Sequence, residues 1–511
     1  MLELVQIDGG PLTRADVVKV ARTAARVEVT ANALAAVAKS RAHIEELANA
    51  EKPTYGISTG FGALATRHIP QDKRAELQRS LIRSHAAGAG PEVEREVVRA
   101  LMLLRLRTLA TGRTGVRQST VETLLGLLNQ RIHPVVHEFG SLGCSGDLAP
   151  LSSIALALMG EGMVRDRLGD LRPAAEVMAE RKVSPVELAE KEGLALINGT
   201  DGMLGMLCLA ADDLRHLLDI ADLTAAMSVE ALLGTDRVFA PDLHALRPHP
   251  GQSISAANMA RFLAGSPIVE SHRGPDCTRV QDAYSLRCSP QVHGAARDTV
   301  GYAETVADRE LASAIDNPVV LPDGRVESNG NFHGAPVAYV LDFLAIPVAD
   351  VASMAERRTD RMLDVARSHG LPPFLADDPG VDSGHMIAQY TQAAIVSELK
   401  RLAVPASVDS IPSSAMQEDH VSMGWSAARK LRKAVDGLTT VLAIELLTAA
   451  RALDLRKPLQ PAPATAAAVA ALREHVEGPG PDRHLAPEIA AAEELIRSGD
   501  LMRAITRKVS R

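Results

Sequence analysis

Residues 203–233 read MLGMLCLAADDLRHLLDIADLTAAMSVEALL, an almost unbroken apolar stretch with a narrow polar face. The polar side chains recur three or four residues apart, which places them on one side of an α-helix. They are Asp212, Arg215, His216, Asp219 and Asp222. A helix with so narrow a polar face is mostly buried, and its charges exclude a membrane span. We therefore expect a long central helix inside a helical bundle.

Other stretches carry helical patterns on both sides of this segment. Thr13 is in position to cap a helix that begins at Arg14, and helical spacing returns over 92–111. An Arg-rich helix is expected around 348–368, and a second long one over 426–456. Aromatic residues are only 3% of the chain while Ala and Leu are abundant, which favours helix over strand. The predicted fold class is mainly all-α.

The predicted chain organisation has three parts. An N-terminal region over about 1–195 precedes a central helical bundle over 196–457, and C-terminal helices follow over 458–511. The Pro- and Ala-rich stretch 459–480 is interpreted as a connector before the last helices.

Composition excludes several classes of function. The net charge of −8, with both signs interspersed, argues against a nucleic-acid partner. The four cysteines show no C-x-x-C spacing, so neither a metal site nor a disulfide framework is expected. An export signal has a basic segment followed by an apolar one, and the first residues show neither. We expect a protein of the reducing cytoplasm, bound neither to a membrane nor to nucleic acid.

The stretch Gly140–Pro150 reads GSLGCSGDLAP and suggests unusual backbone chemistry. Glycine permits tight backbone geometry, so the Gly146 nitrogen can reach the Cys144 carbonyl carbon and close a five-membered ring. Loss of one water from that ring and of the Ser145 hydroxyl as a second water leaves a methylidene conjugated to a carbonyl. The product is an electrophile that needs no external cofactor. Taken alone, the tripeptide equally fits a turn with a small buried Cys.

Two of the five tyrosines lie in polar, loop-like segments. Tyr55 belongs to the Gly-rich loop 53–62, and Tyr284 precedes Arg287 in RVQDAYSLRC (279–288). A guanidinium donates two parallel hydrogen bonds to a carboxylate, so Arg287 suits a substrate carboxylate. A structural tyrosine hydroxyl and a surface ion pair are the open alternatives.

Two further polar segments are ambiguous by themselves. Asn198 precedes the long helix, where Thr200 or Asp201 is the expected cap. Glu418 and His420 are two residues apart, the wrong spacing for two ligands on one helix face, so no metal is expected there.

Taken together, these segments resemble the histidine and aromatic amino acid ammonia-lyases. The order and spacing match the histidine-specific branch from near residue 10 to about residue 460. The matching segments are the Tyr55 loop, Ser84–Gly88, Cys144–Gly146, Asn198–Thr200, Tyr284–Arg287, Ser328–Gly334 and 413–420. Cys144 replaces the usual Ala, Ser153 the frequent His, Asp201 the usual Gln and Met416 the usual Asn.

The resemblance implies a fold like that of fumarase and aspartase, in a homotetramer whose active sites are shared between subunits. It implies deamination of L-histidine to trans-urocanate and ammonia with a 4-methylidene-imidazol-5-one formed autocatalytically from Cys144-Ser145-Gly146. By the family pattern Tyr55 is the base for the β-proton, and Arg287 clamps the substrate carboxylate. Tyr284 and Asn198 orient the amine and the ring. The remaining site residues that the resemblance implies are Ser84, His85, Gln281, Phe332 and Glu418.

Three alternatives remain beside this interpretation. A phenylalanine or tyrosine ammonia-lyase or an aminomutase shares the electrophile, but resembles Phe-Leu or His-Leu where this chain has Ser84-His85. A lyase of the fumarase type needs a G-S-S-x-M-P-x-K-x-N loop, which has no counterpart here. A catalytically inactive scaffold is disfavoured by intact Ser145, Tyr55, Tyr284 and Arg287.

Overall fold

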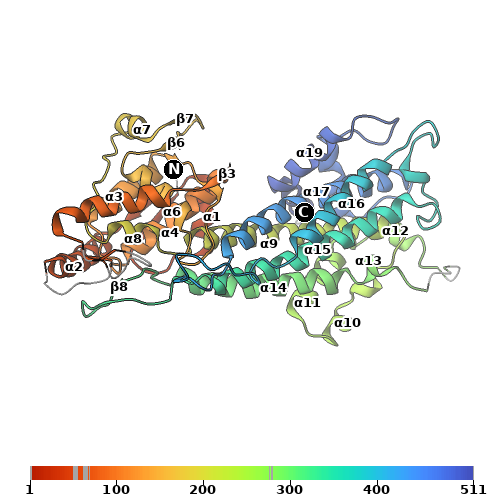
Figure 1. Cartoon of the computed structure of the whole chain (residues 1–511). Helices are drawn as coiled ribbons and strands as arrows, with labels where there is room; N and C mark the ends of the chain where they lie inside the picture. Colours follow the sequence, from red (N-terminus) through yellow and green to blue (C-terminus); the bar gives the residue numbers. More distant parts are fainter. Residues whose placement is uncertain are drawn as a thin grey trace. The chain divides into compact units, whose positions relative to one another are not determined.

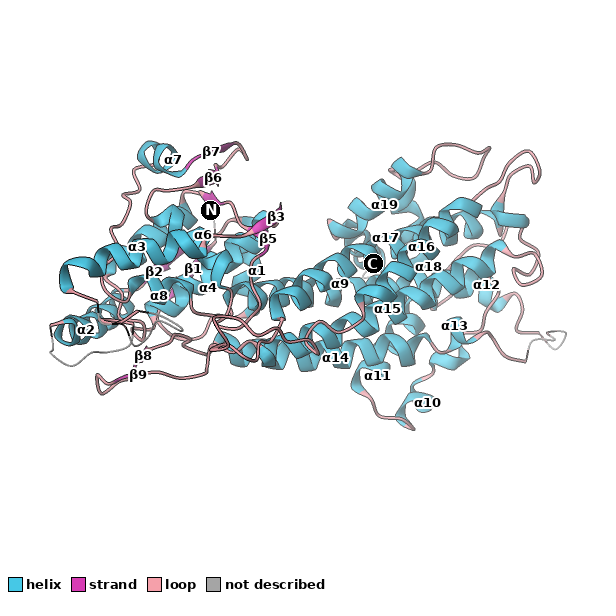
Figure 2. Ribbon diagram, viewed as in Figure 1, coloured by secondary structure: helices cyan, strands magenta, loops and turns pink. Residues whose placement is uncertain are grey.

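The structure is a computed structural model of the 511-residue chain, and it describes residues 3–49, 56–60, 67, 69–274, 277 and 280–509. Helices dominate these residues and the strands are short (Figure 1, Figure 2). The mainly helical fold class predicted from the sequence is thereby confirmed.

The α-helices are α1 (Arg14–Thr23), α2 (Ala31–Ala48), α3 (Arg74–His85), α4 (Arg95–Ala110), α5 (Gln118–Asn129), α6 (Leu148–Leu158), α7 (Ala174–Glu180), α8 (Glu192–Ile197), α9 (Asp201–Ala231), α10 (Pro241–Ala245), α11 (Pro250–Leu263), α12 (Pro267–Glu270), α13 (Tyr284–Arg287), α14 (Ser289–Leu311), α15 (Ala335–Leu363), α16 (Met386–Leu402), α17 (Gly424–Leu455), α18 (Pro463–Arg473), α19 (Ala486–Arg497) and α20 (Asp500–Val509). The strands are β1 (Leu4–Ile7), β2 (Arg26–Val29), β3 (Ala89–Glu92), β4 (His133–Pro134), β5 (His137–Phe139), β6 (Met163–Arg165), β7 (Leu171–Pro173), β8 (Val319–Val320) and β9 (Val326–Glu327). Short 3-10 helices are η2 (Gln71–Lys73), η3 (Arg237–Phe239) and η4 (Pro373–Leu375).

The chain forms two compact units, each made of discontinuous segments. Unit 1 contains Met1–Ala210, Ala303–Asp342 and Pro405–Arg429, and unit 2 contains Ala211–Tyr302, Phe343–Val404 and Lys430–Arg511. The long helices α9, α14, α15 and α17 contribute residues to both units. The three-part division at residues 195 and 457 stays a prediction.

Unit 1 contains the described strands and a buried helix, α4. Its first helix, α1, begins at Arg14 as predicted, because Thr13 and Asp16 form a reciprocal capping box. Strands β1 and β2 pair in parallel, and alternate residues of each point into the core. Helix α4 is buried from Val97 to Ala110, so it forms the core of this unit.

Unit 2 contains all five residues of the polar face predicted for the long central helix. That helix is α9, and Asp212, the first residue of the polar face, is exposed. Asp222, the last residue of the polar face, is instead fully buried. Its carboxylate accepts hydrogen bonds from His293 Nδ1 at 2.8 Å, Arg297 Nη2 at 2.6 Å and Asn258 Nδ2 at 2.9 Å. These partners come from α11 and α14, so periodicity in α9 alone could not reveal them.

The predicted bounds of one helix and the predicted connector before the last helices were wrong. The Arg-rich helix expected around 348–368 begins already at Ala335, as α15, and continues through Pro347. The stretch 459–480 is not a simple connector, because α18 occupies Pro463–Arg473 and starts with Pro at its first position, where no helical N–H is lost.

Helix α15 is also the one described helix long and apolar enough to cross a membrane by length and composition. Its most apolar 18-residue window has a mean hydropathy of 1.7, and 61% of that window is buried inside the structure. The core helix of a soluble protein has the same character.

Candidate active site

The tripeptide predicted to cyclise lies in a tight turn between β5 and α6 in unit 1. Gly146 has φ +79°, in the left-handed region, and forms an isolated parallel bridge with Gly199. A Cβ at position 146 would overlap the Gly199 carbonyl, so only glycine fits there. Ser145, between Cys144 and Gly146, is half-buried. Gly146 thus has the left-handed conformation and the absence of a Cβ that a tight turn needs, and the residues Cys144-Ser145-Gly146 fit the predicted group.

The carboxylate of Asp147 fixes the C-terminal side of this turn. Its Oδ2 accepts from the backbone nitrogens of Gly202 at 2.8 Å and Met203 at 3.0 Å, and its Oδ1 from Ser141 Oγ at 3.0 Å. The Asp147 backbone nitrogen donates to the Gly199 carbonyl at 2.7 Å. Thr200 directly precedes α9, as predicted, and its carbonyl accepts from the Leu204 nitrogen at 2.9 Å, but the capping side chain is that of Asp147, which the sequence did not indicate. The first N–H groups of α9 are instead bound by a residue from a distant segment.

The N-terminal side of the turn is held by the residues that begin α17. Ser422 Oγ donates to the Gly143 carbonyl at 3.0 Å, and the Met423 nitrogen donates to the Leu142 carbonyl at 2.9 Å. Trp425, the single tryptophan of the chain, is buried and donates through Nε1 to the Glu138 carbonyl at 2.6 Å. Both ends of the loop are thus fixed by partners far away in sequence.

Glu418 lies beside Cys144 and His85. The Cys144 thiol is buried, and burial together with the nearby Glu418 charge, to which it hydrogen-bonds, raises its pKa to about 12. Burial lowers the pKa of His85, while the charge of Glu418 opposes that shift. Ser84 Oγ lies 3.1 Å from His85 Nδ1. The site therefore offers a carboxylate, an imidazole and a hydroxyl close to the tripeptide, and it keeps the thiol protonated.

A tight turn presents Glu418. Its Oε2 accepts from Ser413 Oγ at 2.9 Å, and the two residues also exchange backbone hydrogen bonds. Ser414, Ala415 and Met416 have φ between +50° and +69°. Asn tolerates the left-handed region better than Met, which gives a physical reason for the Asn that the resemblance makes usual at position 416.

Asn198 and Phe332 belong to neighbouring segments of the same unit. Asn198 is buried at the end of α8, and its Nδ2 donates to the Asn317 carbonyl at 2.9 Å. Asn317 Oδ1 accepts from the Asn329 backbone nitrogen at 3.1 Å, at the start of the loop that carries half-buried Phe332. The next residue in that loop, His333, stacks on His420 with ring centroids 5.8 Å apart. The Phe332 and Glu418 loops are thereby linked.

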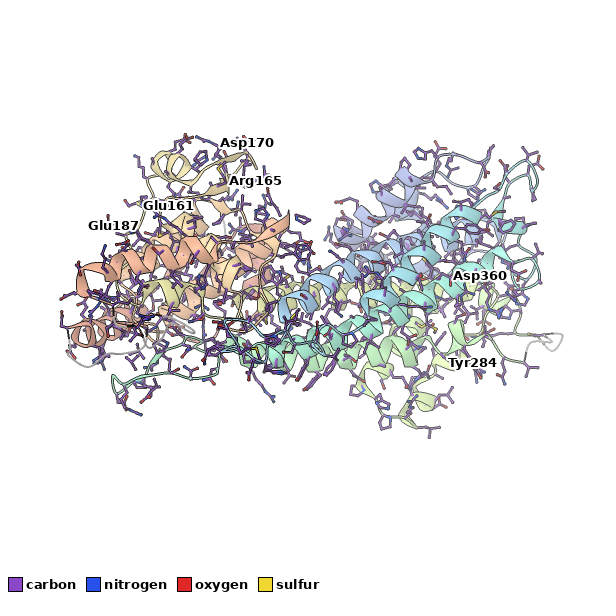
Figure 3. The ribbon with its side chains drawn as sticks, viewed as in Figure 1. Glu161, Arg165, Asp170, Glu187, Tyr284 and Asp360 are labelled. Atoms are coloured by element: carbon purple, nitrogen blue, oxygen red, sulfur yellow. The ribbon has the colours of Figure 1, made fainter. Side chains whose placement is uncertain are left out.

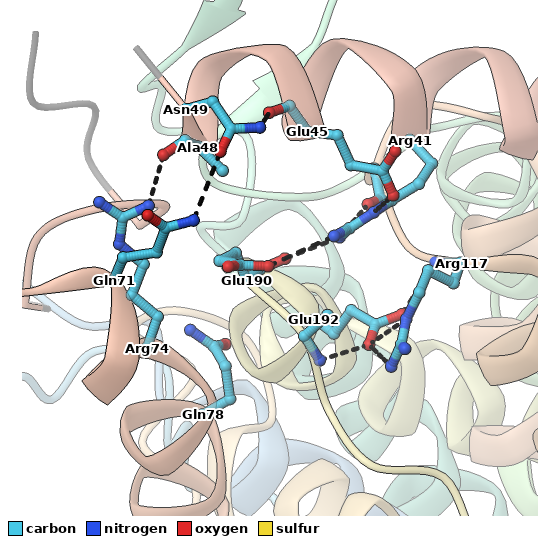
Figure 4. A network of polar contacts seen from close by, with 12 residues as sticks. Arg41, Glu45, Ala48, Asn49, Gln71, Arg74, Gln78, Arg117, Glu190 and Glu192 are labelled. Atoms are coloured by element: carbon cyan, nitrogen blue, oxygen red, sulfur yellow. Dashed lines mark hydrogen bonds and ion pairs between the residues drawn. The ribbon is translucent and has the colours of Figure 1, made fainter. Parts of the chain in front are cut away.

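A buried polar network holds α8 in place (Figure 4). Glu192 is fully buried and accepts from the backbone nitrogen of Arg117 and from its guanidinium. Gln78 on α3 accepts from the Gly193 nitrogen at 2.8 Å. Helices α3, α6 and α8 pack against one another. Since α3 ends at His85 and α8 ends before Asn198, the network fixes both residues relative to the tripeptide.

Asp201 forms a buried ion pair with Arg105 of α4. Arg105 also donates to the Ala195 carbonyl at 2.9 Å, and Thr200 Oγ1 donates to Glu310 at 2.5 Å. The departure from the family's usual Gln at position 201 is therefore compensated by a cation directly beneath the Asn198–Thr200 turn.

Gln281, Tyr284 and Arg287 belong to unit 2. Gln281 and Tyr284 are exposed, and 68% of Tyr284 is accessible. Tyr284 is labelled in Figure 3. The Arg287 guanidinium lies 4.7 Å from the centroid of the Tyr284 ring. This is a cation–π contact. The Arg287 Nε is buried and has no hydrogen-bond partner among the residues that the structure describes.

The short helix α13 that carries Tyr284 and Arg287 rests on a buried ion pair. Arg358 donates to the Ser285 carbonyl at 3.3 Å and to Ser289 Oγ at 3.2 Å. Both side chains of the Arg358–Glu445 pair are fully buried, and Glu445 also accepts from Thr224 and Ser228 of α9. The sequence did not indicate this support, because the residues that form it come from helices far apart in the chain.

The structure thus brings together most of the predicted site residues in unit 1, whereas three lie in unit 2. Those in unit 1 are Ser84, His85, Cys144, Ser145, Gly146, Asn198, Phe332 and Glu418. Tyr55 lies outside the described residues. Among the residues that the structure describes, no group of three or more His, Cys, Asp or Glu side chains is arranged to hold a metal ion.

This fold and site are those of an aromatic amino acid lyase: residues 12–474 match the family model of that description, and the chain belongs to this family. A histidine ammonia-lyase of Streptomyces avermitilis is 65% identical over 504 residues, 98% of each chain. Among solved structures, a tyrosine aminomutase from Streptomyces globisporus has a TM-score of 0.93 at 39% identity, covering 99% of this chain and 98% of the other. A histidine ammonia-lyase from Trypanosoma cruzi has a TM-score of 0.90 at 38% identity, covering 99% and 95%.

The environment of Asp147 predicts a pH dependence of folding stability. Burial raises the pKa of its carboxyl to about 7, although its hydrogen bonds oppose the shift. The folded state then binds more protons than the unfolded state between about pH 4 and 7, so this contribution is full below pH 4 and is lost as pH rises through 7. Asp147→Asn removes the titrating group, and the decline should become shallower.

Urea unfolding midpoints between about pH 4.5 and 8 measure this effect. Asp170→Asn, at an exposed carboxylate of the same unit (Figure 3), is the matched control and should keep the wild-type slope. Equal slopes for the wild type and Asp147→Asn would contradict the assignment.

Proposed function

We propose that this chain deaminates L-histidine to trans-urocanate and ammonia, using an electrophile formed from its own Cys144-Ser145-Gly146. The observation that carries the proposal is the convergence of this tripeptide turn with His85, Asn198 and Glu418 in unit 1. Family membership and the 65% identical histidine ammonia-lyase support the same reaction.

Formation of the electrophile balances without a co-reactant. The Gly146 nitrogen bonds to the Cys144 carbonyl carbon, whose oxygen leaves as water, and the Ser145 hydroxyl leaves with a Cα hydrogen as a second water. Once formed, a 4-methylidene-imidazol-5-one would supply an electrophile for the substrate amine, which would make nitrogen a better leaving group. Position 144 contributes only its carbonyl to the ring, so the Cys side chain is compatible with closure.

The chain's own residues bind the substrate and move its proton. We assign Arg287 to the substrate carboxylate, which suits a guanidinium that carries an unpaired buried Nε. Tyr55 is assigned as the base that removes the β-proton, with a pKa that the site must lower from about 10. Tyr284 and Asn198 orient the amine, while Gln281 and Phe332 line the pocket.

Glu418, Ser84 and His85 are assigned to the substrate imidazole. A ring N–H or an imidazolium suits the Glu418 carboxylate, and Ser84 and His85 are additional polar partners. The tyrosine aminomutase likeness favours a rival substrate, tyrosine, on the same scaffold. Three polar groups around the ring-binding position argue for imidazole instead.

We further propose a cytoplasmic homotetramer with active sites shared between subunits. Large apolar side chains on α14, α15 and α16 are exposed, which is typical of an interface between copies. In unit 2 they are Tyr302, Ile346, Ile387 and Tyr390, each more than half accessible. Burial between subunits would cover these side chains and supply Tyr284 and Arg287 to a neighbouring tripeptide.

The first test is the mass of the mature chain. Wild-type protein should be lighter than its translated sequence by two water molecules, because ring closure and dehydration each expel one. Ser145→Ala has no hydroxyl at this position to eliminate, so it should not form the electrophile. It should lack the two-water mass loss and lose nearly all urocanate formation. Ser153→Ala, whose Oγ bonds only within α6, should retain the wild-type mass loss. Full sequence mass with normal turnover in the wild type would refute the electrophile.

Subunit sharing is tested by mixing two inactive chains. Ser145→Ala lies in unit 1 and Arg287→Ala in unit 2, and each homotetramer should be nearly inactive. If the two residues of one site come from different chains, mixed tetramers contain some intact sites and should recover part of the activity. A mixture of Ser145→Ala with Asn198→Ala is the control, because both residues lie in unit 1. Its recovered activity is compared with that of the Ser145→Ala/Arg287→Ala mixture. No recovery in verified Ser145→Ala/Arg287→Ala mixtures would place both residues on the same chain.

Specificity is tested with histidine and phenylalanine as competing substrates. Phenylalanine would leave Glu418, Ser84 and His85 desolvated and unpaired, so its kcat/KM should be lower by about 10⁴–10⁵. Replacing Ser84-His85 with Phe-Leu should strongly depress histidine turnover and raise phenylalanine turnover from its floor. Urocanate and cinnamate formation by both proteins measure this. Comparable wild-type kcat/KM for the two substrates would be incompatible with the histidine assignment.

A further inference from the structure

A cationic cavity of about 150 Å³ opens in unit 1, apart from the residues of the candidate site. It lies between the end of α1, the start of α4 and strand β4. Its lining consists of Ala21, Arg22, Thr23, Ala24, Arg95, Arg99, Arg131 and His133. None of these described lining residues carries a carboxylate. One water molecule needs only about 10–15 Å³ of such space, so the cavity has room for a polyatomic ion.

Arg99 forms the buried floor of the cavity. Only 2% of it is accessible, and its orientation is fixed by Nε donating to the Val20 carbonyl at 2.8 Å and Nη1 to the Leu128 carbonyl at 3.1 Å. Nη1 also lies 3.3 Å from His133 Nε2, which accepts as a neutral imidazole. Burial, with Arg99, Arg95 and Arg131 nearby, lowers the pKa of His133 to about 3. The floor is thus a preorganised guanidinium beside an uncharged ring.

The rim adds two arginines without counter-ions. Arg95 and Arg131 are both exposed, and neither forms an ion pair with any residue that the structure describes. Arg22 differs, because its Nε is paired with Glu96 at 2.8 Å. The charges that act on Arg99 are those of Arg131 and Arg95, and with its burial they lower its pKa to about 10.

A buried cation surrounded by like charges is costly unless an anion compensates it. The carbonyls that hold Arg99 explain its orientation, but they do not neutralise Arg95 and Arg131. Three guanidiniums that converge on one cavity provide planar forks of N–H donors, the geometry that matches phosphate oxygens.

We propose that this cavity binds a phosphate-type oxyanion, either inorganic phosphate or the phosphoryl group of a small molecule. Arg99 contacts it from the floor, and Arg95 and Arg131 close on it from the rim. Binding there joins α1, α4 and β4, so it stabilises the folded chain by mass action. The site is independent of the lyase chemistry and does not require Ser145 to have reacted.

Calorimetric titration of the whole protein with inorganic phosphate tests the proposal, with pyrophosphate as the phosphoryl-ligand arm. Ionic strength is held constant with chloride, since screening alone alters surface electrostatics. Arg95→Gln/Arg131→Gln should raise the phosphate Kd by at least about tenfold. The control Arg79→Gln/Arg167→Gln removes the same charge from exposed arginines of unit 1 outside the cavity and should leave Kd within about twofold.

Thermal unfolding of the wild type provides a second test that needs no variant. Replacing chloride by phosphate at equal ionic strength should raise Tm, and this gain should disappear in Arg95→Gln/Arg131→Gln. Urocanate formation by both double variants should match the wild type, which verifies that they fold. Absence of phosphate and pyrophosphate binding up to about 20 mM would overturn the proposal, as would equal weakening in the control variant.

Discussion

The buried carboxylate of Asp147 is the interaction on which the candidate site depends. It binds the first N–H groups of α9 through Gly202 and Met203 and the hydroxyl of Ser141, while its own nitrogen reaches the Gly199 carbonyl. Two segments distant in sequence therefore meet at one residue: the tripeptide turn, and the stretch that runs from Gly199 into the start of α9. Since the Gly146–Gly199 contact leaves no room for a Cβ, a small displacement of α9 would alter the turn that presents Ser145.

Close to the Asn198 turn, unit 1 contains two buried ion pairs. Arg105 pairs with Asp201, and Lys191 pairs with Asp316 at 2.5 Å with both side chains fully buried. Such pairs add little net stability, because desolvation offsets their attraction, but removing one partner is costly. We interpret them as devices that hold the Asn198 turn in one arrangement. An electrophile formed by backbone condensation needs this kind of support, because its geometry is set by the main chain before any substrate binds.

Local features were predictable from the sequence, and long-range ones were not. Thr13 and Asp16 are three residues apart, so the capping of α1 follows from sequence alone. The sequence placed Asp222 on the polar face of α9, but it could not show its buried partners, such as His293, because these lie on other helices. Thr200 lies at the start of α9 as predicted, but nothing near it in sequence indicates that the Asp147 carboxylate binds the first N–H groups of the helix. The motif residues came from a family resemblance, whereas their supports, including Arg358 beneath Tyr284, required the structure.

Hydrogen–deuterium exchange of wild type and Asp147→Ala tests the central claim, that this one carboxylate couples the tripeptide turn to the start of α9. Peptides covering 140–147 and 199–206 are compared with a peptide from the buried part of α17, residues 438–450. The account predicts faster exchange in both of the first two peptides and little change in the α17 peptide. The reason is that Gly202 and Met203 lose their hydrogen-bond acceptor, while the 140–147 loop loses its link to α9. Faster exchange confined to 140–147, with 199–206 unchanged, would contradict it.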